Sequence, residues 1–419
     1  MGVTLRVGLV HYTAPPIVGG VESVLGHQAR LLAAGGHQVR VIAGRGGAGG
    51  AGIEVVRVPL ADAREPRIRG LREALDAGRV PADFAPVVAA LSESLATAAA
   101  GLDVLIVHNA LSLHLNLALT AALRELLDAG RLPPVVAWHH DLAHGSPRFA
   151  GSLHPGHPWD LLKGPWAGVT HVAISDARRQ EVIATLGLTA DAVRVIPNGI
   201  DVEAFLGLHP ASRRLLASLR LPLVGPVLLA PARMTPRKNL ELAIAAVASL
   251  RTDGSDARLI VTGPSDPHEA HGKASYADGL AALARQLGVD GAIHLLAHGG
   301  RSTPARVVAD LYLASDALLV TSRDEGFGLP VLEAAVSRLP IICADLPPLR
   351  ALAGAAAAYF QPDAAPAEVA EVIRKRLAAD EETQLRIRVR STLSWASVYA
   401  ARLEPLLREV AGQARPPAG

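Results

Sequence analysis

The 419-residue chain is short of aromatic residues and has a single cysteine, and each shortage limits what the protein can be. Phe, Trp and Tyr make up only 3% of the residues although half of all residues are hydrophobic, so we expect aliphatic, alanine-rich cores. One cysteine excludes an internal disulfide framework. Because Cys343 stands in the apolar run "PIICAD", it is interpreted as a small buried hydrophobe rather than a nucleophile.

The chain also lacks a long apolar run and an excess of charge of one sign. No run approaches the roughly 20 apolar residues of a membrane-spanning helix. The first residues enter a strand pattern, "LRVGLVHY", without the layout of a signal peptide. The formal net charge of +2 at pH 7 argues against non-specific binding to nucleic acid. These absences favour a cytoplasmic enzyme with no nucleic-acid partner.

Apolar strand patterns alternate with helical patterns along the whole chain, which is typical of parallel sheets with crossover helices. The cycle restarts after "IPNGID", so we expect two doubly wound, Rossmann-like α/β domains, residues 1–205 and 206–394. An amphipathic helix is predicted at residues 395–410, followed by a disordered tail at residues 411–419. Strands are expected at residues 5–10, 38–43, 54–58, 104–107, 135–138, 171–174, 194–196, 227–230, 259–262, 293–296, 318–320, 341–343 and 358–360.

The most informative motif is E-G-F-G-L-P-V-L-E, which begins at Glu325 and ends at Glu333. It joins an apolar strand pattern to a predicted helix at residues 329–337, whose first turn has free N–H groups that attract oxyanions. Gly326 and Gly328 let the backbone come close to a ligand. Carboxylates accept hydrogen bonds from hydroxyls, so the motif suits phosphates between two hydroxylated rings, as in a nucleotide-sugar. The alternative is that each acid is a solvated surface charge or a carboxylate near a helix start that the helix dipole stabilises.

A second candidate lies in the loop after the strand pattern "VLLAPAR", which carries Arg233 and Lys238. Both side chains can reach a diphosphate, and positive charge there offsets the charge that develops on a departing nucleotide. Only four of the 41 basic residues are lysines, so a lysine at a loop mouth is more informative than usual. Each residue has the alternative interpretation of an ordinary solvated base.

In the first domain, Gly19 and Gly20 directly precede a helical pattern, so their backbone N–H groups are candidates for binding a phosphate. The pattern is not the G-x-G-x-x-G fingerprint, which disfavours a hydride-transfer enzyme. A double glycine alone is often only a turn.

The strand pattern "VVAWHHD" ends in His139, His140 and Asp141, and His144 follows shortly after. Such a cluster is also found in metal sites. However, neither a cysteine nor a His-Glu-x-x-His helix accompanies it, so we expect no metal.

Two further features point to the acceptor side of a site. His108 and Asn109 end the preceding strand and are candidates for lining it, although a satisfied strand-end histidine is an equal alternative. Residues 141–166 form a connection rich in Gly, Pro and His that is long for its place, and such loops usually carry specificity. We therefore include Asp141, His154 and His157 among the acceptor-side candidates.

The motif from Glu325 to Glu333 resembles the signature of the retaining glycosyltransferases of GT-B fold, family four (group 1), and the resemblance covers nearly the whole chain. It implies that Glu325 binds the donor-sugar hydroxyls and Glu333 the nucleotide ribose. Arg233 and Lys238 have the family's R-x4-K spacing, which implies contact with the diphosphate. His140, immediately before Asp141, matches the family's cleft histidine, with His139 as the competing choice. The donor-binding residues implied in this way are Gly19, Gly20, Gly326, Phe327, Gly328, Leu329 and Glu333.

The resemblance further implies two domains that face each other across a cleft, with the C-terminal helix crossing back to the first domain. The implied reaction is metal-independent, retaining transfer of a hexose from a nucleotide-sugar to an acceptor hydroxyl, with no cofactor. The acceptor can be a glycan, a small molecule or a lipid-linked species. The alternatives are an epimerase or phosphorylase of the same fold, and an inactive sugar-nucleotide-binding protein.

A basic stretch at residues 64–79 raises the further alternative that the first domain docks on anionic lipid. Three acidic residues dilute its charge, and no large apolar face accompanies it. We therefore favour an ordinary solvated helix.

Overall fold

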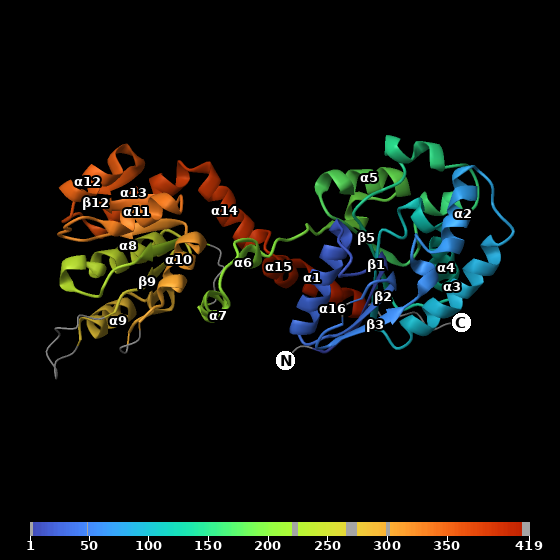
Figure 1. Cartoon of the computed structure of the whole chain (residues 1–419), viewed down its shortest axis with the longest axis horizontal. Coiled ribbons are helices and arrows are strands. Elements are labelled where there is room, and N and C mark those ends of the chain that lie inside the picture. Colours follow the sequence, from blue (N-terminus) through green and yellow to red (C-terminus); the bar gives the residue numbers. More distant parts are fainter. Residues whose placement is uncertain (1–2, 48, 220–224, 265–274, 299–301, 413–419) are drawn as a thin grey trace. The chain divides into compact units, whose positions relative to one another are not determined.

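The computed structural model describes residues 3–47, 49–219, 225–264, 275–298 and 302–412. The chain forms two compact units (Figure 1). The first comprises Met1–Gly199 and Trp395–Gly419, and the second comprises Ile200–Ser394. The first division falls within the sequence "IPNGID", a few residues before the predicted boundary at residue 205.

The first unit is built on a parallel sheet whose described strands follow the order β3-β2-β1-β4-β5-β6-β7. They are β1 (Arg6–Thr13), β2 (Gln38–Arg45), β3 (Ile53–Arg57), β4 (Val104–His108), β5 (Val135–His139), β6 (Val169–Ala173) and β7 (Val193–Val195). Strand β1 pairs with both β2 and β4, and Leu9 stands opposite Val41 on one side and Ile106 on the other. The strand order therefore reverses at β1, and ligands of open α/β sheets bind at such switch points.

Helices cover both faces of this sheet (Figure 1). Alternate residues of β1 point to opposite faces, so Leu9 packs with α1 and the C-terminal helices while Val10 packs with α2, α3 and α4. The helices are α1 (Gly20–Ala34), α2 (Pro66–Asp76), α3 (Phe84–Ala99), α4 (Leu117–Asp128), η3 (Pro147–Ser152), η4 (Trp159–Leu162), α5 (Asp176–Leu186), α15 (Trp395–Val398), the π-helical η9 (Tyr399–Leu403) and α16 (Glu404–Gly412).

The C-terminal helices belong to the first unit, as the family resemblance implies for residues 395–410. Leu406 and Leu407 are buried against the sheet, and Glu404 accepts a hydrogen bond from His37 at 2.8 Å. Of the predicted tail at residues 411–419, the first two residues complete α16. The other seven lie outside the described residues.

The second unit is built on a parallel sheet whose described strands follow the order β10-β9-β8-β11-β12-β13. They are β8 (Val227–Ala230), β9 (Arg258–Val261), β10 (Ile293–Leu295), β11 (Ala317–Val320), β12 (Ile341–Ala344) and β13 (Ala357–Phe360). The central strands β8, β11 and β12 are short and apolar, and both of their faces are buried, as expected of a parallel sheet between helices.

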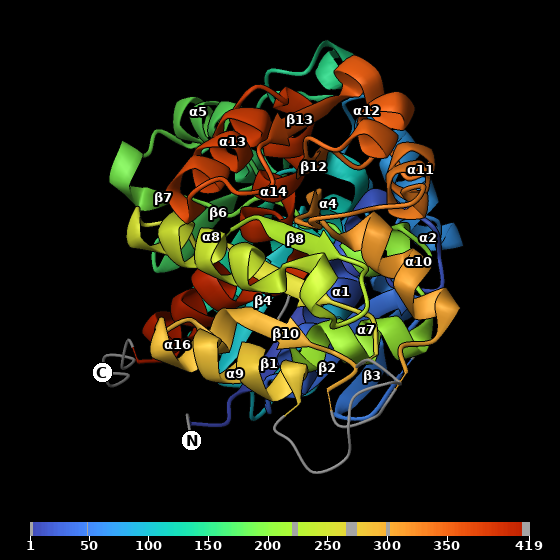
Figure 2. The ribbon, with the colours of Figure 1, turned by 90° about the vertical axis from the view of Figure 1, so that its left-hand side faces the viewer.

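One face of the second sheet packs on α8, α9 and α13 and the other on α7, α10, α11 and α12 (Figure 2). Cys343 is fully buried in β12, and burial raises the pKa of its thiol to about 12, as suits a small core residue. The helices are α6 (Val202–Phe205), α7 (Pro210–Ser218), η6 (Pro236–Lys238), α8 (Leu240–Thr252), α9 (Tyr276–Gln286), α10 (Ala305–Ala314), α11 (Leu329–Val336), α12 (Pro347–Ala353), α13 (Pro366–Ala378) and α14 (Glu381–Thr392).

The chain passes between the two units twice, and within each unit the residues next to the two crossings contact each other. In the first unit, Gly199 lies so close to Trp395 that an added Cβ would stand 2.8 Å from the Trp395 nitrogen. In the second unit, Ile200 pairs with Ser394 in a parallel bridge, and the Ile200 N–H donates to Leu393 O at 2.9 Å. The two crossing segments are therefore neighbours.

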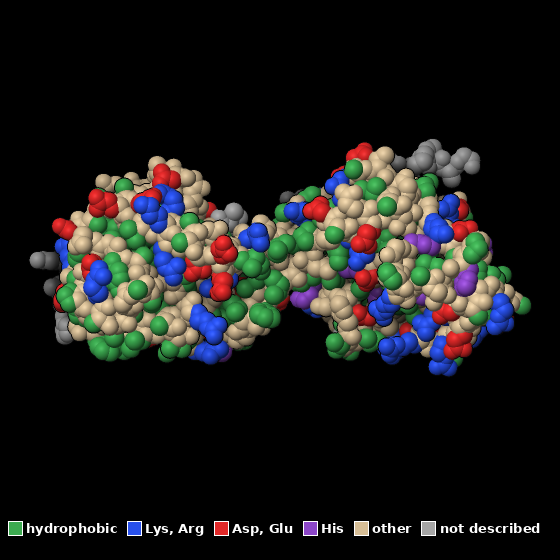
Figure 3. All heavy atoms as spheres, turned by 90° about the horizontal axis from the view of Figure 1, so that it is seen from above, with side chains coloured by type: hydrophobic (Ala, Val, Ile, Leu, Met, Phe, Trp, Pro, Cys, Tyr) green, Lys and Arg blue, Asp and Glu red, His purple; other side chains and the backbone are tan. Residues whose placement is uncertain are grey.

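The surface shows both signs of charge on both units (Figure 3). In α2, which covers most of the basic stretch at residues 64–79, Ile68, Leu71 and Leu75 are buried in the core. Its apolar face is thus already covered. None of the described helices is both long enough and apolar enough to span a membrane.

Candidate active site

Two loops of the second unit meet beyond the carboxyl ends of the neighbouring strands β8 and β11. The Arg323 N–H donates to Arg237 O at 2.9 Å, and the Thr321 hydroxyl donates to Lys238 O at 3.0 Å. These bonds join the loop that carries R-x4-K to the loop that carries E-G-F-G-L-P. The structure therefore brings together two motifs that lie far apart in the sequence.

At this junction Lys238 Nζ lies 2.5 Å from Glu325 Oε1, and the two side chains are only 14% and 8% exposed. The Ser322 hydroxyl donates to the same carboxylate oxygen at 2.6 Å. Two donors on one oxygen orient the carboxylate of Glu325. Sequence reasoning missed Ser322, although its position three residues before Glu325 at the end of the strand pattern was a usable signal.

Two glycines shape the backbone after Glu325. Gly328 adopts a left-handed conformation (φ 104°), and an added Cβ would lie 2.6 Å from Leu349 Cδ2, so a larger residue cannot be accommodated without movement. At Gly326 nothing lies within 4 Å of an added Cβ, so its backbone is open to a ligand. The neighbouring side chains of Phe327 and Leu329 are 54% and 61% exposed.

Glu333 lies on α11, and its carboxylate accepts a hydrogen bond from the phenol of Tyr312. Tyr312 belongs to α10 and is 2% exposed. Burial and the neighbouring carboxylate raise the pKa of Tyr312, which keeps the phenol protonated as a donor. The sequence offered no signal for Tyr312, because the contact joins two helices.

Arg233 follows β8 and is exposed. No carboxylate of the described residues forms an ion pair with it. The end of β9 passes directly beside this loop, since an added Cβ on Gly263 would lie 2.2 Å from Ala232 O. Among the described residues, Arg233 therefore has no carboxylate partner. It lies on a closely packed loop and belongs to the same R-x4-K motif as Lys238, which pairs with Glu325.

In the first unit, a cavity of about 550 Å³ lies beyond the carboxyl ends of β1 and β4. Three of the predicted site residues line this cavity, namely Gly20, Asn109 and Asp141. The space beside Gly20 is open, whereas an added Cβ on Gly19 would lie 2.0 Å from the carboxylate of Glu22. A side chain at position 19 would therefore displace Glu22, whereas the space beside Gly20 would admit one.

His140 is 5% exposed, and its Nε2 lies 3.0 Å from Nδ1 of His108, which is fully buried. Asn109 accepts hydrogen bonds from the His140 and Asp141 N–H groups at 2.8 and 3.1 Å. Burial, reinforced by His11, lowers the pKa of His140 to about 3. His140 is therefore a neutral imidazole near neutral pH, which suits a polar contact and not the donation of a proton from imidazolium.

The competing histidine, His139, is 1% exposed, and its Nε2 lies 3.0 Å from Nδ1 of His171 on the next strand. Burial and His171 lower the pKa of His139 to about 3. Successive residues of a strand point to opposite faces, so His139 and His140 serve different surroundings.

The structure does not bring His154 and His157 to the cavity. His154 Nε2 lies 3.0 Å from Asp76 O, and its ring packs on Trp159. The His157 ring packs edge-on against Phe84. Both histidines attach the long loop to α2 and α3, so their positions indicate a structural contact. Among the described residues, no group of His, Cys, Asp or Glu side chains is arranged to hold a metal ion.

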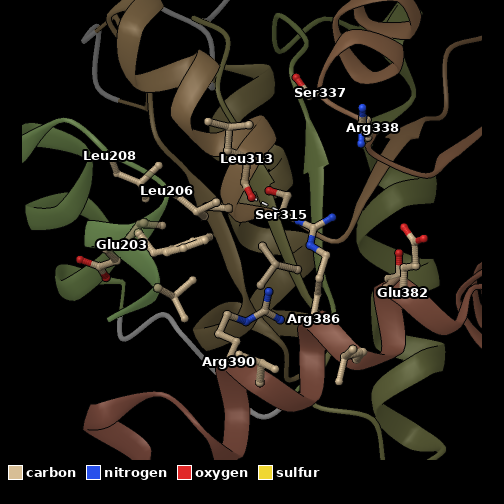
Figure 4. Close-up of a pocket in the computed structure, with 18 of the residues that line it drawn as sticks. Glu203, Leu206, Leu208, Leu313, Ser315, Ser337, Arg338, Glu382, Arg386 and Arg390 are labelled. Atoms are coloured by element: carbon tan, nitrogen blue, oxygen red, sulfur yellow. Dashed lines mark hydrogen bonds between the residues drawn. The ribbon is translucent and has the colours of Figure 1, made fainter. Parts of the chain in front are cut away.

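A second large cavity, of about 580 Å³, lies in the second unit (Figure 4). Glu325 is not one of its lining residues. Its lining includes Leu206, Leu313, Ser315 and Arg386. Residues that come just before β11 and β12 also line it, so the cavity lies at the amino ends of these strands. Because ligands of such sheets bind beyond the opposite ends, this cavity is not part of the candidate site.

Both parts of the chain match known families. Residues 213–391 match the family described as "Glycosyl transferases group 1", and residues 18–204 match "Glycosyltransferase Family 4". The chain belongs to the group 1 glycosyltransferases. The fold of this group 1 glycosyltransferase is GT-B, with two parallel-sheet α/β units, as the sequence predicts.

This group 1 glycosyltransferase is similar to D-inositol 3-phosphate glycosyltransferase of Kineococcus radiotolerans, with 34% identity over 186 residues. The match covers 43% of this chain and 40% of that relative. It is also 28% identical over 187 residues to the serotype-specific mannosyltransferase WbdA of Escherichia coli, covering 44% of this chain and 21% of that relative. The chain thus matches less than half the length of either protein.

Among solved structures, it is similar to sucrose-phosphate synthase from Thermosynechococcus elongatus, with 16% identity and a TM-score of 0.39. That similarity covers 98% of this chain and the whole of the other.

Proposed function

We propose that the protein is a retaining glycosyltransferase that moves a sugar from a nucleotide-sugar donor to an acceptor hydroxyl. The observation that carries the proposal is the nearly buried Lys238–Glu325 pair beyond the carboxyl ends of β8 and β11. An open glycine backbone and the start of α11 follow it directly. A cation, a carboxylate that can accept hydrogen bonds from hydroxyl groups and an open glycine backbone next to a helix start together support this assignment.

Each part of the donor has a matching group. The Glu325 carboxylate accepts hydrogen bonds from the sugar hydroxyls, and the Glu333 carboxylate, oriented by Tyr312, accepts those of the ribose. Arg233, Lys238 and the first turn of α11 stabilise the diphosphate. Since the chain itself supplies positive charge where negative charge develops, we propose that no metal ion is required.

In the reaction, the bond between the anomeric carbon and the phosphate oxygen breaks, and its electron pair leaves with the diphosphate. The acceptor oxygen then bonds to the same face of the oxocarbenium-like sugar, and its proton passes to the departing phosphate oxygen. Retaining glycosidases use a second carboxylate as nucleophile instead. Here Glu325 is held by Lys238 and Ser322, and Glu333 by Tyr312, which supports a mechanism without a carboxylate nucleophile.

The test is incubation of the full-length protein with a panel of nucleotide-sugars, followed by measurement of free nucleoside diphosphate and of the anomeric configuration of the product. We expect nucleoside diphosphate release that survives EDTA and a product with the donor's configuration. An inverted product contradicts retention, and loss of activity in EDTA that Mn²⁺ restores contradicts metal independence. A phosphorylase would need phosphate and release a sugar phosphate, and an inactive binding protein would release nothing.

A further inference from the structure

We infer that the cavity of the first unit binds an acceptor that carries a phosphate or carboxylate group, and that Arg64 and Arg148 recognise this group. The inference deepens the proposed function and rests on it. The cavity of about 550 Å³ is large enough for a sugar-sized molecule, and both arginines line it.

Four arginines line the cavity, and two of them already have carboxylate partners. Arg45 Nε lies 2.8 Å from Asp62 Oδ2, and Arg178 Nη2 lies 3.7 Å from Asp141 Oδ1. In these pairs the positive charge is balanced within the wall. They leave Arg64 and Arg148, whose charge is not balanced in this way.

Arg64 and Arg148 form no ion pair with any acid in the parts of the chain that the structure describes. The Arg148 guanidinium instead lies over the ring of Phe149, 5.1 Å from its centroid. Phe149 also lines the cavity and packs against His114. A planar guanidinium suits bidentate hydrogen bonding to a phosphate or carboxylate, so both side chains are suited to bind an anion.

The turn that carries Arg64 is rigidly built. Asp62 is 7% exposed, and its Oδ1 accepts a hydrogen bond from the Arg64 N–H at 2.9 Å while Oδ2 contacts Arg45. The end of β2 packs directly on this turn, since an added Cβ on Gly44 would lie 2.0 Å from the Asp62 nitrogen. The backbone at Arg64 is therefore fixed at the edge of the cavity, so less freedom is lost on binding.

The same cavity also offers acceptors for hydroxyl groups. The His11 Nδ1 lies 2.8 Å from Thr13 O and 3.4 Å from Thr13 N. Because the nearer atom is a carbonyl oxygen, which can only accept, we assign the proton to Nδ1, which leaves Nε2 as an acceptor. Burial lowers the pKa of His11, although the Thr13 carbonyl and Glu22 oppose this effect. The Glu22 carboxylate accepts the Thr13 hydroxyl at 2.5 Å and lines the cavity. A polyhydroxylated molecule with one anionic group matches these acceptors and the two free arginines together.

The experiment is calorimetric titration of the full-length protein at about 150 mM salt with glucose, glucose 6-phosphate and glucuronate. We expect at least one of the two anionic sugars to bind at least tenfold more tightly than glucose, because hydrogen bonds to charged groups are the stronger ones. Arg64→Ala and Arg148→Ala should each weaken the binding of that sugar about tenfold. The matched control is Arg69→Ala, which removes an exposed arginine of α2 that does not line the cavity.

Equal binding of the three sugars, no binding of any, or an equal loss in Arg69→Ala would overturn the inference. The outcome is different if the wild type binds phosphatidylglycerol vesicles but no sugar phosphate, and if Arg64→Ala and Arg148→Ala lose the vesicle binding. In that case the anion is a lipid headgroup. The release of nucleoside diphosphate from nucleotide-sugars separates the two proposals. If the wild type binds glucose 6-phosphate but releases nucleoside diphosphate from no nucleotide-sugar, the proposed function fails and the anion site stands.

Discussion

The ammonium of Lys238 lies 2.5 Å from the carboxylate of Glu325, although 87 positions of the sequence separate the two residues. The pair joins a residue assigned to the diphosphate with one assigned to the donor sugar. A change at either residue therefore alters the surroundings of the other.

The pairing predicts non-additive kinetics. Lys238→Ala should lower kcat about 10²-fold or more, because it removes charge that stabilises the departing diphosphate. Glu325→Gln should also lower kcat, and the double variant should lose less than the product of the two effects, since each single change leaves the other charge without its partner. Steady-state kinetics of the three variants test this. Strictly multiplicative losses would show that the two side chains act independently.

Tyr312→Phe tests how Glu333 is held. Loss of the phenol leaves the carboxylate free to rotate, so the donor KM should rise roughly threefold to tenfold while kcat changes little. Glu333→Ala should raise KM further. Tyr276→Phe is the matched control, since Tyr276 is another phenol of this unit that donates to a glutamate, Glu241. A wild-type KM in Glu333→Ala would remove the ribose assignment.

The buried histidines predict a loss of stability in mild acid. The pKa of His139 and of His140 is lowered to about 3 by burial, whereas an unfolded histidine titrates near pH 6.5. Between these values the unfolded chain binds more protons, so stability is full above about pH 6.5 and falls as the pH drops. At pH 5 each histidine should lower the free energy of unfolding by about 2 kcal/mol. Denaturant unfolding of the wild type and His140→Asn from pH 7 to 5 tests this. The same dependence of the unfolding free energy on pH in both proteins would contradict it.

A buried ion pair predicts the largest effect on the second unit. Arg390 donates to both oxygens of Asp316, at 2.8 and 2.6 Å, and Asp316 also accepts the Val227 N–H at 2.7 Å. Asp316 is fully buried, so Asp316→Ala leaves a buried cation uncompensated and should destabilise the unit by about 3–5 kcal/mol. Asp128→Ala, which breaks an exposed pair with Arg124, should cost roughly 0.5 kcal/mol. Equal midpoints in denaturant would contradict this difference.

The sequence was sufficient to predict the sheets, because their strands are short aliphatic runs bounded by turn residues. A strand is present at each of the thirteen predicted positions, with ends that differ by up to three residues. The helix after Glu325 also begins at the expected Leu329. Period and composition determine such elements locally, so their detection requires no knowledge of distant contacts.

The contacts within the site could not be predicted in the same way. The Tyr312–Glu333 and His108–His140 pairs join residues from different elements, and their distances depend on sheet register and helix packing. The prediction for His154 rests on its place in a loop rich in Gly and Pro, a pattern typical of ligand-binding residues, and its contact with α2 could not be foreseen from that pattern. Only the packing shows that its ring instead contacts Asp76 O.

The adjacent crossings at Ile200 and Ser394 have a topological consequence. The whole second unit is an uninterrupted insertion into the first, and its two ends are neighbours. It can therefore be excised from the gene as one cassette, and a short loop is enough to rejoin Gly199 to Trp395. The first unit, by contrast, is assembled from two segments on either side of this insertion, so the helices that begin at Trp395 must be synthesised before that unit can close.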